Sequence, residues 1–349
     1  MLLLEKVILV SRRKRLFDFF KGDFVILKDF YGSFEVVEPV LLDLIESQPV
    51  QRLKSVSHQG IIKPAKLFYS RFEHSIGVML LLRKFGAGLE EQVAGLLHDV
   101  SHTAFSHSSD MLFGSYEIQG FQDSIQAKKV ESGVVSEILL RNGFDPARIG
   151  LPELFPLLER EAPDLCADRL DYSFRDMTAL GVDVSPVLKH LIIFREEFVF
   201  DSKQWAGFYA RNYVSLQMEH YASLNDMTKV KILMTALQIA LNRGIITRED
   251  VIGGVDEEVI NKINASGDED SWNLIDSLKK GDYNVLSGGD VVLKAKFRFV
   301  DPKFVENGGL LRLSEVDSSY KKLLESDRKK CSEGFKVNII VGGKSLPST

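Results

Sequence analysis

The sequence lacks the many cysteines of a disulfide scaffold and the excess of basic residues that a polyanionic partner requires. Its 349 residues include two cysteines, Cys166 and Cys331, which lie far apart and match no metal-binding spacing. This excludes a disulfide framework and a thiolate cluster, so we expect a reducing, cytoplasmic location. The net charge of -5 provides no basic excess for the phosphates of nucleic acid, so a nucleic-acid partner is not expected.

Long apolar runs are also lacking. The opening segment MLLLEKVILV is interrupted by Glu5 and Lys6 and is too short to cross a bilayer. Its basic run at 12–15 follows the apolar part, the reverse of a secretory signal. The segment is typical of a buried strand, and no membrane partner is expected.

Helical periodicity, by contrast, dominates the chain as far as about residue 245. The expected helices cover 37–48, 71–85, 90–100, 131–145, 163–181, 205–224 and 226–243. Beyond them, 247–254, 255–266 and 271–281 are typical of short helices, and 293–300, 309–316 and 335–342 of strands. The sequence thus predicts a mainly α fold. Residues 1–245 would form a helical domain with a short N-terminal strand region, and 246–349 a small α+β region.

Histidine is scarce as well, yet three of the seven histidines fall in the segment LLHDVSHTAFSH at 96–107. His98 and Asp99 end an apolar helix, and imidazole with carboxylate suits a divalent ion such as manganese, iron, magnesium, zinc or nickel. His74 on the preceding helix and Asp168 on a later one would complete a ligand set, because bundles build metal sites from facing helices. The alternative is a hydrogen-bonded His-Asp pair in the core without a metal.

Three segments in this order, RFEHSIGV, AGLLHDVSHTAFSH and ADRLDYSFRD, resemble the HD-domain phosphohydrolases. The similarity is greatest to the branch of deoxynucleoside triphosphate (dNTP) triphosphohydrolases that includes the mammalian SAM-and-HD-domain enzyme. It runs from IESQPVQRL at 45 to ALGVDV at 184, and more loosely to about 280. The resemblance implies an HD-domain helical bundle with a bound divalent metal ion. It also implies hydrolysis of a dNTP to deoxynucleoside and triphosphate by a homo-oligomer.

The resemblance further implies roles for individual residues. The metal ligands would be His74, His98, Asp99 and Asp168. His102 and His107 match histidines that line the phosphate site, with His107 as the catalytic one and Asp110 as its carboxylate partner. Arg71 and Arg169 match phosphate-binding positions, and Tyr172 and Asp176 match residues that hold the sugar.

The residue types suit these roles, although plainer explanations exist for several of them. Asp168, Tyr172 and Asp176 are spaced i, i+4 and i+8, so one helix face presents all three. Arginines bind phosphate through forked hydrogen bonds. The alternatives are an exposed Arg71 paired with Glu73 or a helix end, Arg169 paired with Asp171 or Glu161, and Tyr172 as ordinary packing.

The chain departs from the family pattern at several positions. Gln122 and Asp123 stand where the triphosphohydrolases have a histidine-glutamate pair, and glutamine cannot transfer a proton. His58 and Gln59 fall near the sugar-recognising positions, and the activating-nucleotide contacts around Glu46, Gln51 and Lys54 are altered. Two further hypotheses therefore stay open: a phosphohydrolase of nucleoside monophosphates or other phosphomonoesters, and a nucleotide-binding regulatory protein that has lost turnover.

Overall fold

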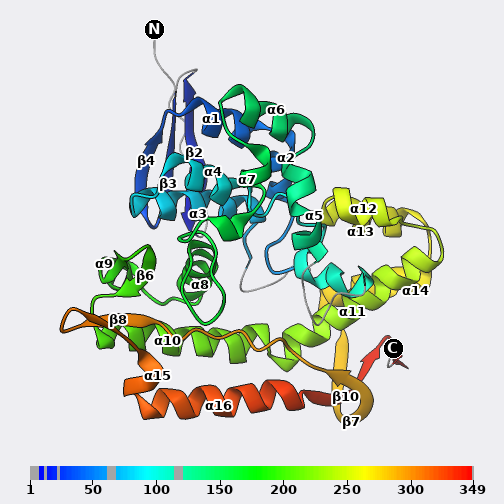
Figure 1. The fold of residues 1–349 in the computed structure, drawn as a ribbon. Helices are drawn as coiled ribbons and strands as arrows, with labels where there is room; N and C mark the ends of the chain where they lie inside the picture. Colours follow the sequence, from blue (N-terminus) through cyan, green and yellow to red (C-terminus); the bar gives the residue numbers. More distant parts are fainter. Residues whose placement is uncertain (1–7, 12–13, 22–23, 61–67, 114–120, 348–349) are drawn as a thin grey trace.

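The computed structural model in Figure 1 describes residues 8–11, 14–21, 24–60, 68–113 and 121–347, and of residues 8–21, 110 and 111 only the backbone. A four-stranded sheet in the order β1-β2-β3-β4 comes first. Its strands are β1 (Ile8–Ser11), β2 (Lys14–Lys21), β3 (Phe24–Asp29) and β4 (Gly32–Val36). The strand expected over residues 1–10 overlaps β1 at its end, and residues 1–7 lie outside the described part.

A bundle of helices packs beside this sheet. Its helices are α1 (Pro39–Glu46), α2 (Gln48–Arg52), α3 (Arg71–Lys84), α4 (Leu89–Leu97), α5 (Phe121–Val130), α6 (Gly133–Arg141), α7 (Pro146–Ile149), α8 (Ala167–Ala179) and α9 (Ser185–Lys189). Short 3-10 turns cover Leu53–Ser55, Ser106–Phe113 and Pro152–Leu154. Helix α3 contacts α4 and α8 and is buried over most of its length, which makes it the centre of the bundle.

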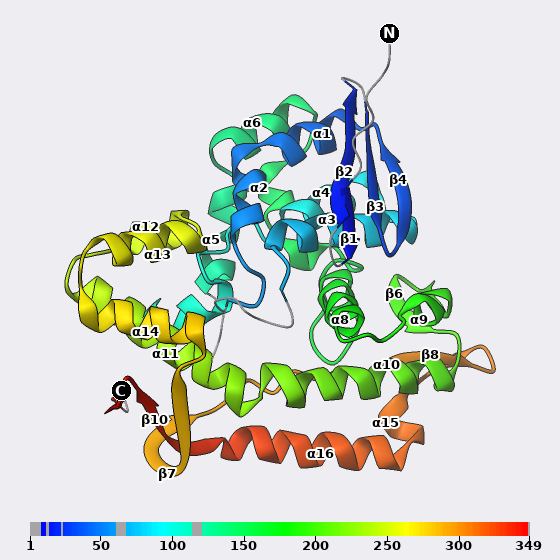
Figure 2. The same cartoon turned by 180° about the vertical axis from the view of Figure 1, so that it is seen from behind.

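A second sheet joins segments about a hundred residues apart. The hairpin β5 (Leu191–Phe194) and β6 (Glu197–Phe200) extends into β8 (Lys303–Glu306) and β9 (Gly309–Arg312), and β6 runs parallel to β8 with Phe200 opposite Phe304. Helix α10 (Lys203–Leu216) continues into a π-helical turn, Gln217–Tyr221. The short α15 (Leu313–Val316) leads into α16 (Ser318–Glu333), which lies alongside α10 in Figures 1 and 2.

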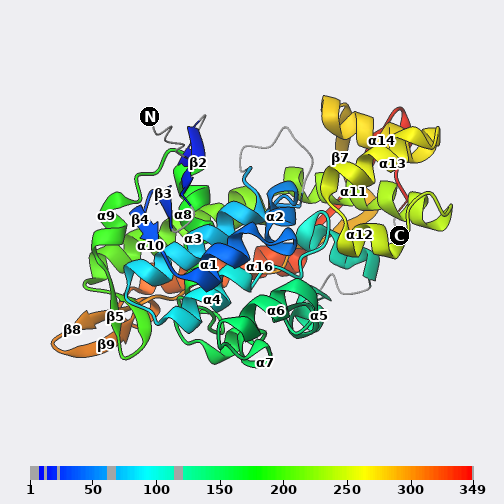
Figure 3. The same cartoon turned by 90° about the horizontal axis from the view of Figure 1, so that it is seen from above.

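The remaining elements gather on one side of the molecule, as the view from above shows (Figure 3). They are α11 (Leu224–Asn242), α12 (Arg248–Gly253), α13 (Asp256–Ala265), α14 (Glu269–Lys280), β7 (Tyr283–Leu293), β10 (Phe335–Val341) and β11 (Lys344–Ser345). The strands form a sheet in the order β11-β10-β7. No helix in the described part of the chain is both long and apolar enough to span a membrane.

Two hydrophobic cores underlie this arrangement. The larger contains buried residues from β3 through α10 together with α15 and α16, and the smaller contains α11 to α14 with β7 and β10. Ala104 and Phe105, from the loop after α4, belong to the smaller core although the helix before them belongs to the larger. The mainly helical fold with a smaller α+β region is therefore as expected, and the division at residue 245 stays a prediction.

The C-terminal part differs from expectation in detail. The strand expected at 293–300 is wrong, because β7 ends at Leu293 and 294–300 form no regular strand. Phe297 and Phe299 there pack against the larger core and Ala295 against the smaller, while residues 296–299 line a cavity. The strand expected at 309–316 turns into α15 after Arg312. Helix α16 and strand β7 were not expected from the sequence.

Candidate active site

The start of α3 is fixed by a capping box. The hydroxyl of Ser70 accepts a hydrogen bond from the backbone N–H of Glu73, and the Glu73 carboxylate accepts one from the backbone N–H of Ser70 at 2.6 Å. These bonds satisfy helix-end donors, and they place Arg71 and His74 three residues apart on one face. The alternative of an exposed Arg71 paired with Glu73 is wrong, since Arg71 is 2% exposed.

Two histidines approach each other through their Nε2 atoms. His98 follows the last residue of α4, and its Nδ1 donates to the carbonyl of Gly95 at 2.8 Å. His74 Nδ1 lies 2.8 Å from a carboxylate oxygen of Asp171. Because a carbonyl and a carboxylate only accept, both Nδ1 atoms carry the proton. In the neutral rings the two Nε2 atoms, 3.2 Å apart, therefore present lone pairs to a common point.

The carboxylates of Asp99 and Asp168 border the same point. His74 Nε2 lies 2.9 Å from Asp168 Oδ1 and 3.8 Å from Asp99 Oδ2, and His98 Nε2 lies 3.6 Å and 3.5 Å from oxygens of the same two residues. The four residues expected as ligands are thus brought together. Two imidazole nitrogens and two carboxylates, with the Nδ1 atoms engaged elsewhere, fit a divalent cation.

The pKa shifts of Asp99, Asp168 and His74 also indicate that the cluster favours a positive charge. Burial would raise the pKa of Asp99, but the charge of Arg71 and the nearby histidines hold it well below its usual range. Burial would also raise the pKa of Asp168, and hydrogen bonds with His74 and His98 lower it instead. Burial would lower the pKa of His74, but bonds to Asp168 and Asp171 raise it to about 9. The cluster therefore stabilises a positive charge at its centre.

Asp171 is a site residue that the sequence reasoning missed. Besides His74, its carboxylate accepts from the hydroxyl of Tyr31 at 2.8 Å and from Arg175 Nε at 2.6 Å. Arg175 also contacts Asp29 at 2.7 Å, so one guanidinium serves two carboxylates whose side chains are both buried. The available signal was the spacing of Asp168 and Asp171, which puts two carboxylates on neighbouring positions of one helix.

Gly77 makes this network possible. A Cβ built there would lie 2.1 Å from Asp171 Oδ1 and 1.9 Å from Arg175 Nη2. Only a residue without a side chain allows α3 and α8 to approach so closely. The glycine one turn after His74 thus places the carboxylate that orients the His74 ring.

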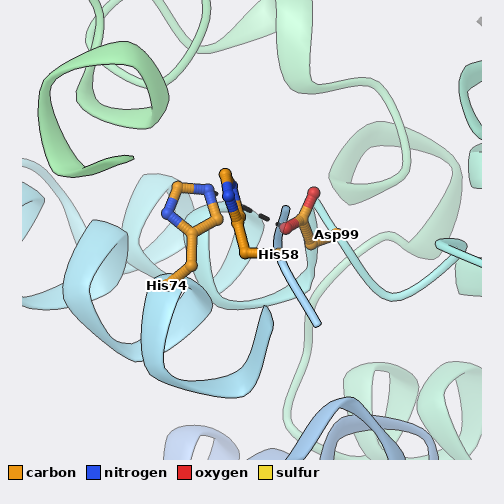
Figure 4. A group of neighbouring side chains, drawn as sticks. All are labelled: His58, His74 and Asp99. Carbon is orange, nitrogen blue, oxygen red and sulfur yellow. Dashed lines mark ion pairs between the residues drawn. The ribbon is translucent and has the colours of Figure 1, made fainter. Parts of the chain in front are cut away.

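A third histidine, His58, stands beside the cluster. Ligand atoms of His58, His74 and Asp99 lie within 4.8 Å of one another, and Figure 4 shows the three side chains together. The His58 ring stacks on Tyr69 at 4.8 Å, and its buried Nδ1 has no hydrogen-bond partner among the described residues. Burial and the nearby charge of Arg71 lower its pKa well below the usual value, so the ring is neutral.

The loop after α4 carries His102 and His107. His102 Nε2 lies 3.2 Å from Asp99 Oδ1, and the rings of the two histidines meet edge to face at 4.9 Å. Burial, followed by the positive charge of Arg71, lowers the pKa of His102 to about 4. Burial and the charges of His102, Arg71 and Arg298 hold the pKa of His107 well below its ordinary value. The side chain of Asp110, expected to pair with His107, lies outside the described residues.

Backbone strain in this loop is offset by contacts from two other elements. Phe105 and Ser106 have φ values of 61° and 51°, a region that bulky residues rarely occupy. The Asp256 carboxylate, at the start of α13, accepts from the backbone N–H of Phe105 at 2.8 Å and of Ser57 at 2.9 Å. Arg71 Nε donates to the hydroxyl of Ser106 at 2.6 Å. The smaller core thereby holds both loops that border the histidines.

A cavity of about 760 Å³ opens over the cluster. Of the residues expected in the site, its lining includes Arg71, His98, Asp99, His102, His107, Asp168, Arg169 and Tyr172. His74 is fully buried behind His98 and Asp168. A cavity of this size is in the range that holds small organic ligands.

Asp176 does not line this cavity itself, but two of its hydrogen-bond partners do. It is fully buried, and it accepts from Tyr221 at 2.5 Å and from Gln59 Nε2 at 3.1 Å. Tyr221 and Gln59 both line the cavity. Tyr172 lines it too, with its hydroxyl 2.5 Å from that of Tyr213. Asp176 therefore acts by positioning a tyrosine and an amide.

The two arginines expected at phosphate already have protein partners. Arg71 Nη1 contacts Asp99 at 2.5 Å. Arg169 donates to the carbonyl of Asp164 at 2.5 Å and of Arg160 at 3.2 Å, and its guanidinium lies 3.9 Å from the carboxylate of Glu159. These partners differ from the Asp171 and Glu161 considered from the sequence.

Gln122 and Asp123 line the cavity near the start of α5. Gln122 is buried and its amide donates to Asp123 at 3.2 Å. Burial and the nearby charge of Asp99 raise the pKa of Asp123. The pair expected to replace the family histidine and glutamate is therefore placed beside the cluster.

Comparisons with known proteins support a metal-dependent phosphohydrolase. The HD domain family model matches residues 71–160. The uncharacterized protein YdhJ of Bacillus subtilis is 33% identical over 320 residues, which cover 89% of this chain and 97% of YdhJ. The metal-dependent phosphohydrolase cns2 of Cordyceps militaris is 38% identical over 162 residues, 45% of this chain and 46% of cns2.

Two further similarities concern the branch and the fold. The deoxynucleoside triphosphate triphosphohydrolase SAMHD1 of Danio rerio is 34% identical over 101 residues, 24% of this chain and 16% of SAMHD1. A crystal structure of a hypothetical protein from Aquifex aeolicus matches with a TM-score of 0.60 at 18% identity, over 88% of this chain and 99% of that one. That match supports the fold alone. With YdhJ related over nearly its whole length and the HD model matched around the clustered histidines, the chain belongs to the HD-domain superfamily of metal-dependent phosphohydrolases, close to its dNTP triphosphohydrolase-like branch.

Proposed function

We propose that the protein hydrolyses a deoxynucleoside triphosphate to deoxynucleoside and intact triphosphate. One observation carries the proposal. The Nε2 atoms of His74 and His98 lie 3.2 Å apart beside Asp99 and Asp168, under a cavity large enough for a nucleotide. In this proposal those four residues hold a divalent cation. Such an ion, when bound, neutralises phosphate charge and makes hydroxide available from water near neutral pH.

His107 would supply the proton for the leaving group. Water adds to the α-phosphorus, the bond from that phosphorus to the 5'-oxygen breaks, and the oxygen takes a proton from His107. With no substrate bound, burial and neighbouring positive charges lower the pKa of this ring, so it is neutral. A phosphate anion beside it opposes those charges and raises the pKa, so protonation would accompany substrate binding. Asp110 would support the ring, and His102 would orient Asp99.

The sugar would lie against the part of the cavity formed by α8 and the turn after α10. Tyr172 presents its ring there, while Gln59 and Tyr221 present polar groups held by Asp176. Amide and hydroxyl groups of this kind recognise sugar hydroxyls by hydrogen bonds. Arg71 and Arg169 would contact phosphate at the edge of the metal site.

A phosphomonoester is the second candidate substrate, and two observations favour it. Arg71 and Arg169 already have protein partners, so they offer less charge to a triphosphate than unpaired arginines would. Gln122 takes the place of a proton-transferring histidine, which matters less for a phosphomonoester whose leaving hydroxyl is more acidic than the 5'-hydroxyl of a nucleoside. A regulatory protein without turnover has the weaker case, because the ligand set and His107 are all present.

Product analysis tests the proposal. The purified protein is incubated with manganese, iron or magnesium and with each of the four deoxynucleoside triphosphates or several nucleoside monophosphates, alongside His107→Ala. We expect deoxynucleoside and intact triphosphate from the wild type and a loss of turnover of about 100-fold or more in the variant. Free phosphate from monophosphates alone would establish the second candidate. Full activity of His107→Ala would rule out the proposed proton donor.

A further inference from the structure

The charges that line the cavity pose a problem for any phosphate substrate. Among the described residues, seven acidic side chains line it: Asp99, Asp123, Glu153, Glu159, Glu161, Asp168 and Asp226. Five lysine or arginine side chains oppose them: Arg71, Arg160, Arg169, Lys296 and Arg298. A bound divalent cation alone does not balance both the acids and a polyanionic substrate, so the location of the remaining cations decides where phosphates can lie.

The three arginines in or near the HD domain are held by protein contacts. Arg71 faces Asp99, and Arg169 donates to the carbonyls of Asp164 and Arg160. Arg160 itself donates to the carbonyl of Pro156 at 2.9 Å and lies 3.5 Å from the carboxylate of Glu197. These contacts fix the guanidinium groups in place and offset part of their charge.

The other two cations lie on the segment 296–299, which comes from the C-terminal part of the chain. Its aromatic residues, Phe297 and Phe299, stack with centroids 5.2 Å apart and planes 14° from parallel. The guanidinium of Arg328, on α16, lies over both rings at 5.0 Å and 4.7 Å. Gln217 Nε2 donates to the carbonyl of Lys296 at 3.0 Å, which ties the segment to the turn after α10.

This anchoring holds the segment at the cavity wall. Phe297 and Phe299 pack against the larger core and also line the cavity, and the two cations that alternate with them, Lys296 and Arg298, line it too. Burial is the largest influence on these groups, lowering the pKa of His107 and raising the pKa of Tyr213 and Asp123. The charge of Arg298 disfavours the protonated form of His107 and Tyr213, and the charge of Lys296 does the same at Asp123. Arg298 is half-buried, so its charge is screened less than that of the exposed Lys296.

We propose that Arg298, assisted by Lys296, binds the phosphate groups of the substrate and so forms a phosphate subsite outside the HD domain. The identity of the substrate as a nucleotide rests on the proposed function, whereas the subsite requires only an anionic phosphate chain. The rigid stack of Phe297, Phe299 and Arg328 holds the subsite at the cavity wall. A forked guanidinium in the wall of the cavity that His107 also lines is suited to phosphate oxygens.

Binding of inorganic triphosphate tests the subsite without turnover. Calorimetric titration into manganese-loaded protein would compare wild type with Arg298→Gln, Lys296→Gln and Lys294→Gln. Lys294 is exposed and outside the cavity lining, so it controls for the loss of one charge from the same segment. We expect Kd to rise about tenfold or more for Arg298→Gln, about threefold for Lys296→Gln and less than about twofold for the control.

Turnover of a deoxynucleoside triphosphate, measured in parallel, separates this inference from the proposed function. We expect Arg298→Gln to raise KM by about tenfold with a smaller change in kcat, and Arg298→Lys to recover part of the loss. If the wild type binds triphosphate in an Arg298-dependent way but hydrolyses no dNTP, the subsite stands and the proposed function fails. If Arg298→Gln matches the Lys294 control in Kd, or the wild type binds no triphosphate, the subsite is overturned.

Discussion

Two buried carboxylates on α8 show how hydrogen-bond partners set the charge of a residue. Burial would raise the pKa of Asp171, but the charge of Arg175 and the hydrogen bond with His74 lower it. Asp176 is equally buried, yet its hydrogen-bond donors are the neutral side chains of Tyr221 and Gln59, and burial raises its pKa to about 7. One carboxylate therefore stays ionised and orients the His74 ring, while the other is near its titration point at neutral pH.

The raised pKa of Asp176 predicts a pH dependence of stability. The folded protein keeps a proton on Asp176 up to about pH 7, whereas the unfolded chain releases it at the ordinary aspartate pKa of 3.8. The stability that comes from this proton is complete below pH 3.8 and is lost as the pH rises towards 7. Asp176→Asn keeps an acceptor for Tyr221 but cannot titrate. Urea unfolding across this window should therefore show a shallower pH dependence for the variant, and identical slopes would contradict the shift.

At the scale of elements, the contact between α3 and α8 determines the geometry of the site. Helix α3 carries Arg71 and His74, and α8 carries Asp168 and Asp171. The capping box sets where α3 begins, and Gly77 sets how closely the two helices approach. The distance between His74 Nδ1 and Asp171 is thus a consequence of helix packing.

Gly77→Ala should disrupt this contact. The added methyl would lie about 2 Å from Asp171 and Arg175, so the buried network must shift, at a cost of about 1–3 kcal/mol in unfolding free energy. Metal retention should also fall, because Asp171 no longer orients His74. Gly207→Ala, within α10, is the matched control, since the nearest atom to an added Cβ there, Leu313 Cδ1, lies 3.9 Å away. Chemical denaturation should find the control neutral or slightly more stable, and a Gly77 variant as stable as the control would contradict the account.

At the scale of the whole molecule, the site combines residues that belong to recognisable sequence motifs with residues from distant segments that carry no motif. His74, His98, Asp99 and Asp168 follow motifs whose order and residue types identify the superfamily, so their convergence could be predicted. Arg298 could not, because the alternating pattern of 293–300 is equally typical of a strand and of an extended segment packed on a core. Only the tertiary fold brings this segment beside His107.

The same limit applies to Asp256 and His58. Asp256 opens an ordinary amphipathic helix, and nothing local to it indicates that its carboxylate holds the backbone of Phe105 and Ser57. His58 has no motif of its own, and its position beside His74 depends on how its loop packs on Tyr69. Contacts that lie far apart in sequence leave no periodic signal, which is why these residues required the structure.

The central claim is that His74, His98, Asp99 and Asp168 form a metal site that is distinct from the proton donor. The most direct test is elemental analysis of the purified wild type, Asp99→Ala, Asp168→Asn and His107→Ala, with circular dichroism to verify folding. Asp168→Asn should disturb the fold less than Asp99→Ala, because the Asp168 side chain is 26% exposed while Asp99 is buried against Arg71. We predict stoichiometric divalent metal in the wild type and His107→Ala, and little in either ligand variant. Folded ligand variants that retain the full metal content would contradict the site.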